Sequence, residues 1–266
     1  MTRSVVLWIV AVAVGVGAGV WQRLSGPSYP WHGRVDVGGA EVPVSLPRSH
    51  VTTSPARVAV PAPGAGTRGT LYWRGFPVDG PFAATPMRRA GDTLAADLPL
   101  RAPARMVEYY AELGTAAGET RLVPATGRAV VLRYRDPIPA PLLVSHIAVM
   151  MLALVLGARA GLAAAFEGER YRSLALLTLA AIVLGGLVLG PATEKAAFGT
   201  WWTGVPLGWD VTDNKTLLAF VGWVAAVFAG ERRLRSAPVL VLAACALMLA
   251  VYLVPHSVVG SSLRAY

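Results

Sequence analysis

Five apolar runs without a charged residue constrain this chain more than any other feature of its sequence. They cover residues 5–20, 142–158, 173–189, 216–229 and 237–254. A helix needs about 20 apolar residues to cross the hydrocarbon core of a bilayer, and each run approaches that length. Only 15% of the residues are charged, whereas soluble domains carry about 25%. The sequence therefore predicts an integral membrane protein with one N-terminal helix and four further membrane-spanning helices.

Arginines in the short connections between the runs predict how the chain is oriented. Cytoplasmic loops of membrane proteins carry an excess of Lys and Arg, so both arginine-rich loops are expected on the inner side. The stretch 191–215, the tail from His256 and the segment before Pro141 then lie outside, and the N-terminus lies inside. We expect the inner (cytoplasmic) membrane of a bacterium. The arginines that decide the orientation are Arg159, Arg170, Arg172, Arg232, Arg233 and Arg235.

Residues 1–24 form the first region. Its apolar run follows Arg3 and precedes Arg23, which fits either a cleaved signal peptide or an uncleaved anchor. The end of the run lacks a small-x-small cleavage site, and Trp8 and Trp21 suit the two membrane interfaces. These features favour a transmembrane anchor or signal-anchor.

Residues 25–138 differ in character, being rich in Pro, Gly and Arg, with short alternating apolar segments. Period-two alternation bounded by Gly and Pro turns predicts half-buried strands. About seven such strands predict an extracytoplasmic all-β domain of the Ig-like sandwich type. Its histidines, His32 and His50, have no partner at metal-ligand spacing and are expected at the surface. The clearest strand segments are 57–60, 70–73, 106–113 and 129–134.

Composition argues against several classes of function. The formal net charge of +9 indicates membrane topology and attraction to anionic lipid, because no basic face interleaved with aromatics suggests nucleic-acid binding. Cys245 is the single cysteine, so an intrachain disulfide, a Cys-x-x-Cys pair and a covalently attached c-type haem are all excluded. The outward loops contain Glu194, Asp210 and Asp213 but no Ser-His-Asp arrangement or zinc-ligand cluster, which disfavours a hydrolase.

Residues 139–266 form the third region, a four-helix membrane domain with two histidines. His146 lies about five residues into its helix, roughly 8 Å deep, and His256 closes the last helix on the same side. An ionisable residue inside a membrane segment costs free energy unless it has a partner. Two neutral imidazoles at one level can ligate a haem iron from opposite faces. Alternatively, His146 hydrogen-bonds a neighbouring helix and His256 lies in the interfacial belt.

The outward loop 196–213 between the middle helices is dense in tryptophan. Four of the eight tryptophans lie between Trp201 and Trp223. An interfacial aromatic belt accounts for any one of them. A cluster of this density in a Gly-rich loop, beside two histidines, also offers a flat apolar platform on which a porphyrin can stack.

The order of these features resembles the cytochrome c assembly proteins, a haem-handling membrane family with a tryptophan-rich WWD signature. Residues 198–202 followed by Trp209-Asp210 resemble its outward Trp-rich segment, and Gly186 and Gly190 resemble its paired glycines. His146 corresponds to the first haem-ligating histidine of that family. The segment 256–260, which begins His256-Ser257, resembles its second.

The resemblance implies a protein that presents haem b at the outer membrane face, with His146 and His256 as its two axial ligands. Apocytochrome c or another envelope protein is the implied partner, beside haem and lipid, and cytochrome c biogenesis is the implied process. The remaining implied cofactor-binding residues are Trp201, Trp202, Trp209 and Asp210.

The chain also departs from the family pattern. Six residues separate Trp202 from Trp209 where the family has about one. A Pro-Lys-Glu-Thr segment after the aspartate is replaced by residues 211–216. Full-length family members have more helices, so this chain would be a minimal core fused to a β domain. Two alternatives therefore remain open: a haem b membrane subunit that transfers electrons, and a non-haem envelope interaction protein that its helices anchor.

Overall fold

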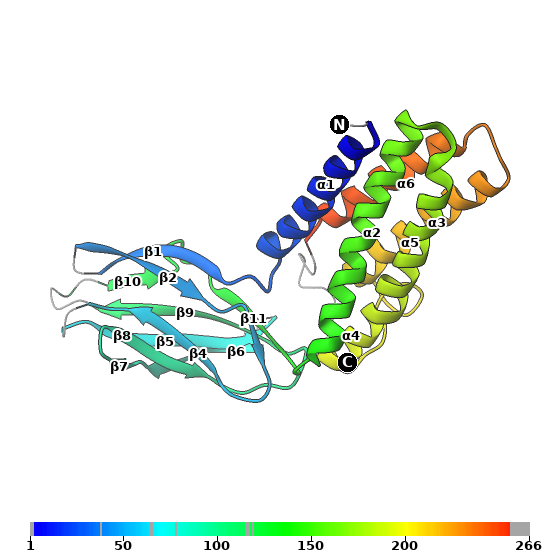
Figure 1. The fold of residues 1–266 in the computed structure, drawn as a ribbon. Helices are drawn as coiled ribbons and strands as arrows, with labels where there is room; N and C mark the ends of the chain where they lie inside the picture. Colours follow the sequence, from blue (N-terminus) through cyan, green and yellow to red (C-terminus); the bar gives the residue numbers. More distant parts are fainter. Residues whose placement is uncertain are drawn as a thin grey trace. The chain divides into compact units, whose positions relative to one another are not determined.

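The computed structural model describes residues 3–37, 39–63, 66–77, 79–114, 118 and 120–255. The chain divides into two compact units (Figure 1). A helical unit combines residues 1–26 with residues 138–266, and a β unit comprises residues 27–137. These boundaries lie close to those expected from the sequence, and the first apolar run joins the C-terminal helices in one unit.

The helical unit contains five long helical segments within the described residues. Four of them are long and apolar enough to cross a membrane, and the last is a shorter apolar helix of 17 residues. The elements are α1 (Arg3–Ser25), α2 (Ala140–Phe166), η1 (Gly168–Arg170), α3 (Tyr171–Ile182), η2 (Val183–Leu189), α4 (Gly190–Phe198), α5 (Val211–Glu231) and α6 (Ala237–Leu253).

The third long segment differs from the sequence expectation because it does not end at Leu189. The chain continues from α3 through a π-helical stretch, η2, into α4, and so remains helical to Phe198. In η2 the Gly190 N–H reaches back to the Gly185 carbonyl, the five-residue spacing of a π-helix. Pro191 lies in the first turn of α4, where its missing N–H costs no hydrogen bond.

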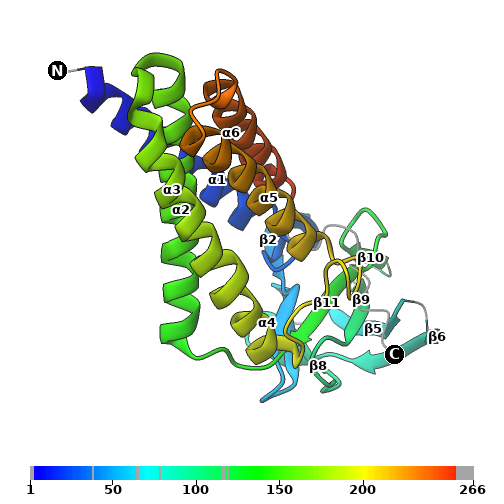
Figure 2. The ribbon, with the colours of Figure 1, turned by 90° about the vertical axis from the view of Figure 1, so that its right-hand side faces the viewer.

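Four helices form a ring, and α1 packs on its outside. Around the ring, α2 contacts α3, α3 contacts α5, α5 contacts α6 and α6 contacts α2, while α1 lies against α2 and α6 (Figure 2). The interior consists mostly of alanine, and its larger members include Trp223, Tyr171 and Met248. Small interface residues let membrane helices approach closely. Accordingly, a Cβ atom added at Gly157 would lie 2.2 Å from the Met248 side chain and 3.1 Å from that of Trp223.

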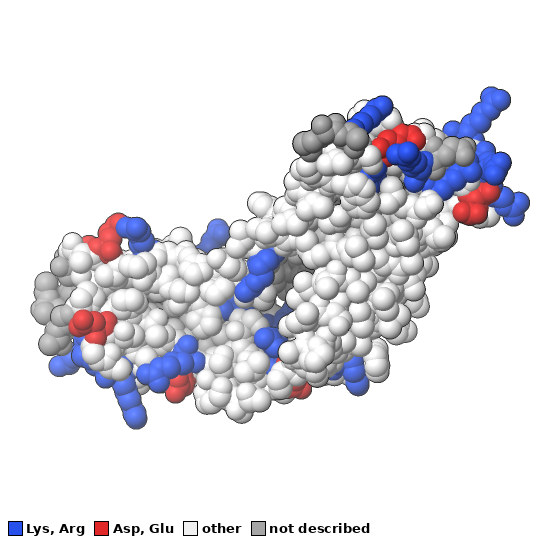
Figure 3. Space-filling view, in the orientation of Figure 1, with Lys and Arg blue, Asp and Glu red and all other residues white. Residues whose placement is uncertain are grey.

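The outer surface of these helices is apolar. Large hydrophobic side chains such as Val144, Ile147 and Leu152 are exposed on α2, and the other long helices carry similar side chains. Figure 3 shows an uncharged flank on the helical unit, with arginines gathered where α2 gives way to α3 and α5 to α6. This distribution is typical of helices that contact lipid along their sides and water at their ends.

The β unit contains eleven strands within the described residues, more than the seven expected. A two-stranded sheet pairs β1 with β2, a six-stranded sheet has the order β3-β11-β9-β5-β6 with β10 beside β9, and a three-stranded sheet has the order β4-β8-β7. All pairs are antiparallel except β3 with β11. The strands are β1 (Trp31–Val37), β2 (Ala40–Leu46), β3 (Ser49–Val51), β4 (Ala56–Pro61), β5 (Arg68–Phe76), β6 (Asp79–Pro86), β7 (Arg88–Ala90), β8 (Thr93–Leu98), β9 (Met106–Gly114), β10 (Thr120–Val123) and β11 (Val130–Arg135).

One hydrophobic core serves all three sheets of the β unit. The alternating segments singled out in the sequence lie in β4, β5, β9 and β11, which confirms them as strands. Two buried tyrosines donate hydrogen bonds to backbone carbonyls: Tyr109 to Pro47 at 2.7 Å and Tyr134 to Pro99 at 2.9 Å. The sheets are open and mixed, so the Ig-like sandwich stays a prediction. His32 is exposed, and His50 is half-buried against Tyr134.

Candidate functional site

The predicted site residues that the structure describes lie at one end of the helical unit. Here α2 begins, α4 ends, α5 begins and α6 ends. The connection between α4 and α5, residues 199–210, is called the Trp loop below, and this end is called the Trp-loop end. His256 lies outside the described residues, two positions beyond Val254.

His146 lies on the second turn of α2 and is half-buried against the π-helical stretch. Its Nδ1 atom is 3.0 Å from the Gly185 carbonyl oxygen. A carbonyl oxygen only accepts hydrogen bonds, so Nδ1 carries the proton. In the neutral ring the lone pair is then on Nε2, the nitrogen that remains available to a metal. Histidine ligands in metalloproteins are commonly oriented by such a bond from their other ring nitrogen.

The π-helical stretch provides both the acceptor and the space for this imidazole. Gly185 accepts the histidine bond in addition to the Gly190 N–H. A Cβ atom at Gly190 would lie 3.6 Å from Cε1 of His146. Single π-helical turns occur frequently at functional sites because they displace one turn of a helix. Here the widened turn lies beside the first predicted ligand.

The tryptophans of the Trp loop are not buried together. Trp201 is 60% exposed and Trp209 79% exposed, whereas Trp202 is half-buried and donates from Nε1 to the Val205 carbonyl at 3.1 Å. Trp223 is separate from them, fully buried in the bundle interior. The loop therefore presents two exposed tryptophans, and the third, Trp202, bonds within the loop.

Asp210 has a local structural role. It is the N-cap of α5, and its Oδ1 accepts hydrogen bonds from the N–H groups of Thr212 at 2.7 Å and Asp213 at 3.3 Å. Its own N–H donates to the Thr203 carbonyl at 3.0 Å. An N-cap aspartate satisfies amides that otherwise lack partners. Asp210 therefore closes the Trp loop and starts the next helix.

Two residues on the first turn of α5, Asp213 and Asn214, accept hydrogen bonds from the loop backbone. Oδ2 of Asp213 accepts from the N–H groups of Thr203 at 2.6 Å and Gly204 at 3.0 Å. Oδ1 of Asn214 accepts from Val205 N–H at 2.8 Å. Three successive loop amides thus point at two neighbouring side chains.

Glu194 of α4 completes the attachment of the loop. The Thr203 hydroxyl lies 2.8 Å from Oε1 of Glu194 and 3.3 Å from Oδ2 of Asp213. One hydroxyl donates only one proton, so it donates to one carboxylate at a time. Alternatively, it donates to one carboxylate and accepts a hydrogen bond from the other in its protonated form. The two helices that flank the loop are therefore joined through it.

The next two residues of α5 reach different partners. Lys215 is buried, and its Nζ donates to the Val254 carbonyl at the end of α6 at 2.6 Å. Thr216 packs on the π-helical stretch, because a Cβ atom at Gly186 would lie 2.6 Å from Cγ2 of Thr216. Gly186 follows Gly185, the acceptor for His146.

Residues 213–216 (Asp-Asn-Lys-Thr) are functional candidates that the sequence analysis missed. They appeared there as a departure from the family pattern, and Asp213 also as one of the acidic residues weighed for a hydrolase. A signal was present: an Asp at a helix start with another acidic residue three positions later is typical of helix N-termini. That signal predicts a cap, but the four separate partners depend on how distant segments pack.

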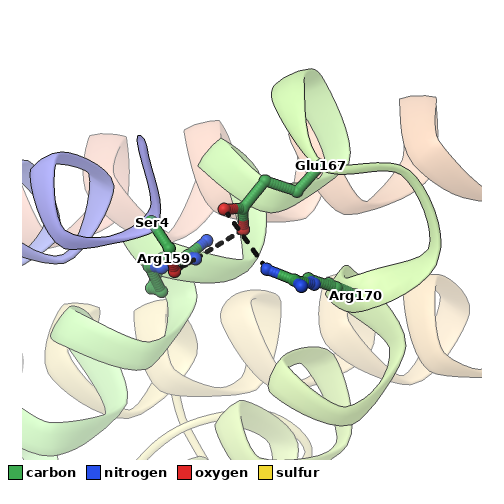
Figure 4. A network of polar contacts seen from close by, with 4 residues as sticks. All are labelled: Ser4, Arg159, Glu167 and Arg170. Carbon is green, nitrogen blue, oxygen red and sulfur yellow. Dashed lines mark hydrogen bonds and ion pairs between the residues drawn. The ribbon is translucent and has the colours of Figure 1, made fainter. Parts of the chain in front are cut away.

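A second polar network lies at the opposite end of the helical unit, where α2 ends (Figure 4). Nη2 of Arg159 lies 2.5 Å from Oε2 of Glu167 and 3.2 Å from the Ser4 hydroxyl of α1. Its guanidinium also lies over the ring of Trp8. Arg170 adds a longer ion pair to Glu167 at 3.9 Å. Arg159 was expected in a cytoplasmic loop and instead lies inside α2, buried against α1.

Comparison with known proteins adds no assignment: no family model and no curated protein matches this sequence. Within the described ranges, no group of three or more His, Cys, Asp or Glu side chains is placed to hold a metal ion. Function is therefore argued from the Trp-loop end itself.

Proposed function

We propose that this chain is a membrane protein that binds haem b at the Trp-loop end, with His146 and His256 as axial ligands. The observation that carries the proposal is the bond between Nδ1 of His146 and the Gly185 carbonyl. It fixes the tautomer and orients the ring, and it leaves Nε2 as the coordinating nitrogen. An intramembrane histidine held in this way is well suited to ligate iron.

The Trp loop supplies the apolar contact surface. Trp201, Leu207 and Trp209 are all exposed. Flat aromatic rings stack favourably on other π systems and exclude water from them. Trp202 and Asp210 stabilise the loop through hydrogen bonds to its backbone.

The polar residues around the Trp loop have a structural role, which their hydrogen bonds define. Asp213 and Asn214 accept hydrogen bonds from the loop backbone, Glu194 accepts one from the Thr203 hydroxyl, and Lys215 donates one to the Val254 carbonyl at the end of α6. Bound haem supplies a redox-active iron and reactive vinyl groups; the protein binds it, orients it and limits its contact with water. We infer that the Trp-loop end faces the outer side of a bacterial inner membrane, because the opposite end is rich in arginine and the positive-inside rule predicts that such an end is cytoplasmic.

We propose cytochrome c biogenesis as the process, with haem presented to an apocytochrome or another envelope protein. The β unit, for which an Ig-like fold is proposed, would face the same compartment and take part in recognising that partner. A haem b electron-transfer subunit is the second candidate. The many hydrogen bonds that fix the Trp loop favour it, because a rigid site suits a permanent cofactor better than one that is released.

The test is an absorption spectrum of detergent-purified protein, oxidised and reduced. We expect a Soret band with sharp reduced α and β bands, lost or shifted in His146→Ala and in His256→Ala. His32→Ala is the matched control, since His32 is exposed on the β unit, and its spectrum should equal that of the wild type. Retention of haem by the double variant His146→Ala/His256→Ala would contradict the ligand assignment.

Two further outcomes separate the candidates. Haem that passes to a partner apocytochrome supports biogenesis, whereas haem that stays bound with a reversible midpoint potential supports electron transfer. Protein that is colourless and takes up no added haem would reject haem binding, and it would leave the anchored interaction protein as the function to test.

A further inference from the structure

Arginines gather at the end of the helical unit opposite the Trp loop, called the arginine-rich end below (Figure 3). The connection from α2 to α3 and the connection from α5 to α6 both lie here (Figure 1). Residues 159–172 and 230–236 together contain six arginines and three glutamates, a net charge of +3. The arginines are Arg159, Arg170, Arg172, Arg232, Arg233 and Arg235, and the glutamates are Glu167, Glu169 and Glu231.

The two connections form one surface because the end of α5 packs against the start of α3. A Cβ atom at Gly230 would lie 3.8 Å from Cγ of Arg172 and 3.8 Å from Cε2 of Tyr171. Segments that are far apart in the sequence thus lie side by side. Their arginines contribute to the same positively charged surface.

The carboxylates at this end do not neutralise the exposed arginines. Glu167 is bonded to the buried Arg159, and its contact with Arg170 is long, at 3.9 Å. The Arg170 side chain is 71% exposed. The three arginines of residues 230–236 are also exposed, and among the residues that the structure describes none of the three forms an ion pair. Positive charge therefore remains available to a ligand.

Exposed apolar side chains lie beside these cations. The guanidinium of Arg232 lies over the ring of Phe228, with Cζ 5.2 Å from the ring centre, and that of Arg3 lies over Phe166 at 5.6 Å. Both rings are exposed, and so is Leu234 between two arginines. Such pairs suit a molecule with an apolar chain and an anionic head, because the ring contacts the chain while the guanidinium reaches the head.

Arg233 adopts a backbone conformation that favours glycine. Its φ is +52°, and it follows the C-cap of α5. The N–H groups of Leu234 and Arg233 bond to the Ala229 and Gly230 carbonyls, each at 3.0 Å, which is the Schellman pattern of helix ends. Glycine is usual at this position because a side chain strains it. The chain thus has an exposed arginine where glycine would be less strained.

We propose that the arginine-rich end binds the headgroup of an anionic phospholipid, with Arg170, Arg232 and Arg233 as its cationic contacts. Guanidinium groups bind phosphate through paired N–H donors, and basic clusters beside membrane helices bind anionic headgroups. The exposed Phe228 and Leu234 favour a lipid over a soluble phosphate, because an acyl chain covers them. This site is more specific than the general attraction that the net charge predicts, and it does not depend on haem binding.

The test measures the lipid affinity of full-length, detergent-purified protein by native mass spectrometry, which counts bound lipids singly. Phosphatidylglycerol and phosphatidylcholine with the same acyl chains are titrated separately, so that the two ligands differ only in the headgroup. The variants are Arg170→Gln and the double variant Arg232→Gln/Arg233→Gln. The matched control is Arg34→Gln/Arg57→Gln, since both of these arginines are exposed on the β unit.

We expect the wild type to bind its first phosphatidylglycerol more tightly than its first phosphatidylcholine. An arginine close to an anionic headgroup contributes about fivefold to affinity. Arg170→Gln should therefore raise the Kd for phosphatidylglycerol about fivefold, and the double variant should raise it about 25-fold. The Kd for phosphatidylcholine should change little in these variants, and the control should change neither value.

Arg233→Gly separates lipid binding from folding. It removes the cation and relaxes the backbone, so the protein should resist SDS better while its Kd for phosphatidylglycerol rises about fivefold. Arg233→Lys keeps the charge and should retain most of the affinity. A loss of SDS resistance in Arg233→Gly, with unchanged lipid affinity, would assign this arginine to the fold alone and contradict its role in the site.

Three further results would overturn the inference. The first is equal affinity of the wild type for the two lipids. The second is a double variant that keeps the wild-type preference for phosphatidylglycerol. The third is displacement of the bound lipid by inorganic phosphate at the same concentration, because this would identify a site for the ion and not for the lipid.

Discussion

At the residue scale, the Arg159–Glu167 pair is notable because both side chains are almost fully buried, 3% and 7% exposed. Breaking a buried pair leaves one charge without compensation, which is far more costly than losing a pair in water. The β unit offers a contrast: Arg34 and Glu41 lie 3.6 Å apart and are each 70% exposed.

We therefore predict different costs for two chemically identical substitutions. Glu167→Gln should lower the free energy of unfolding by about 3–5 kcal/mol, whereas Glu41→Gln should cost about 0–1 kcal/mol. Unfolding by titration with SDS, followed by tryptophan fluorescence, measures the first, and thermal unfolding of the β unit followed by circular dichroism measures the second. Equal small effects would show that the buried pair does not stabilise the helical unit.

A second prediction at this scale concerns alkaline pH. Burial raises the pKa of Tyr109 well above its ordinary value of 10.0. Because the pKa is higher in the folded state, the unfolded state loses its proton first. The stability contribution is therefore complete below about pH 10 and falls as pH rises further. Unfolding of the β unit measured by circular dichroism from pH 8 to 12 should show this loss, and Tyr109→Phe should reduce the slope.

At the scale of elements, the contact of α1 with α2 depends on glycines spaced four apart. A Cβ atom at Gly15 would lie 2.6 Å from Cγ2 of Val155, and one at Gly19 would lie 2.4 Å from Sδ of Met151. Gly17 has no atom within 4 Å of the corresponding point. Small residues on one face thus let the two helices approach closely, and α1 is a packed member of the helical unit.

This geometry predicts that Gly15→Val destabilises the helical unit by about 1–3 kcal/mol, the usual cost of overpacking. Gly17→Val, on the open side of the same helix, is the control and should be close to neutral. SDS titration of both variants measures the difference. A loss that is equal in the two variants would mean that helix propensity, not the contact with α2, is responsible.

At the scale of the whole molecule, the positive-inside rule predicts that the arginine-rich end lies in the cytoplasm and the Trp-loop end lies outside. Single-cysteine variants test this orientation in a Cys245→Ser background. Leu207→Cys in the Trp loop should react with a membrane-impermeant maleimide in intact spheroplasts, and Leu234→Cys should react only after lysis. Both positions are exposed, so accessibility is matched. The reverse labelling pattern would invert the topology.

Sequence alone determined the membrane helices and the main strands because both leave a local signal. Long apolar runs indicate helices that contact lipid, and period-two alternation in segments such as 106–113 indicates a strand buried on one face. The helix bounds were less predictable. The helix α5 begins at Val211, five residues before its apolar run, because Asp210 caps it and a polar first turn suits a helix end. The π-helical stretch carries the third segment beyond Leu189.

Tertiary structure alone decided how the site is held together. The sequence singled out His146 from its place in an apolar run, but its bond to Gly185 joins residues on different helices. Lys215 and Val254 are likewise 39 positions apart. Such contacts form only when helices pack, and no local pattern encodes which carbonyl a side chain will meet. The polar residues after the Trp loop therefore became interpretable only once α4, α5 and α6 were placed together.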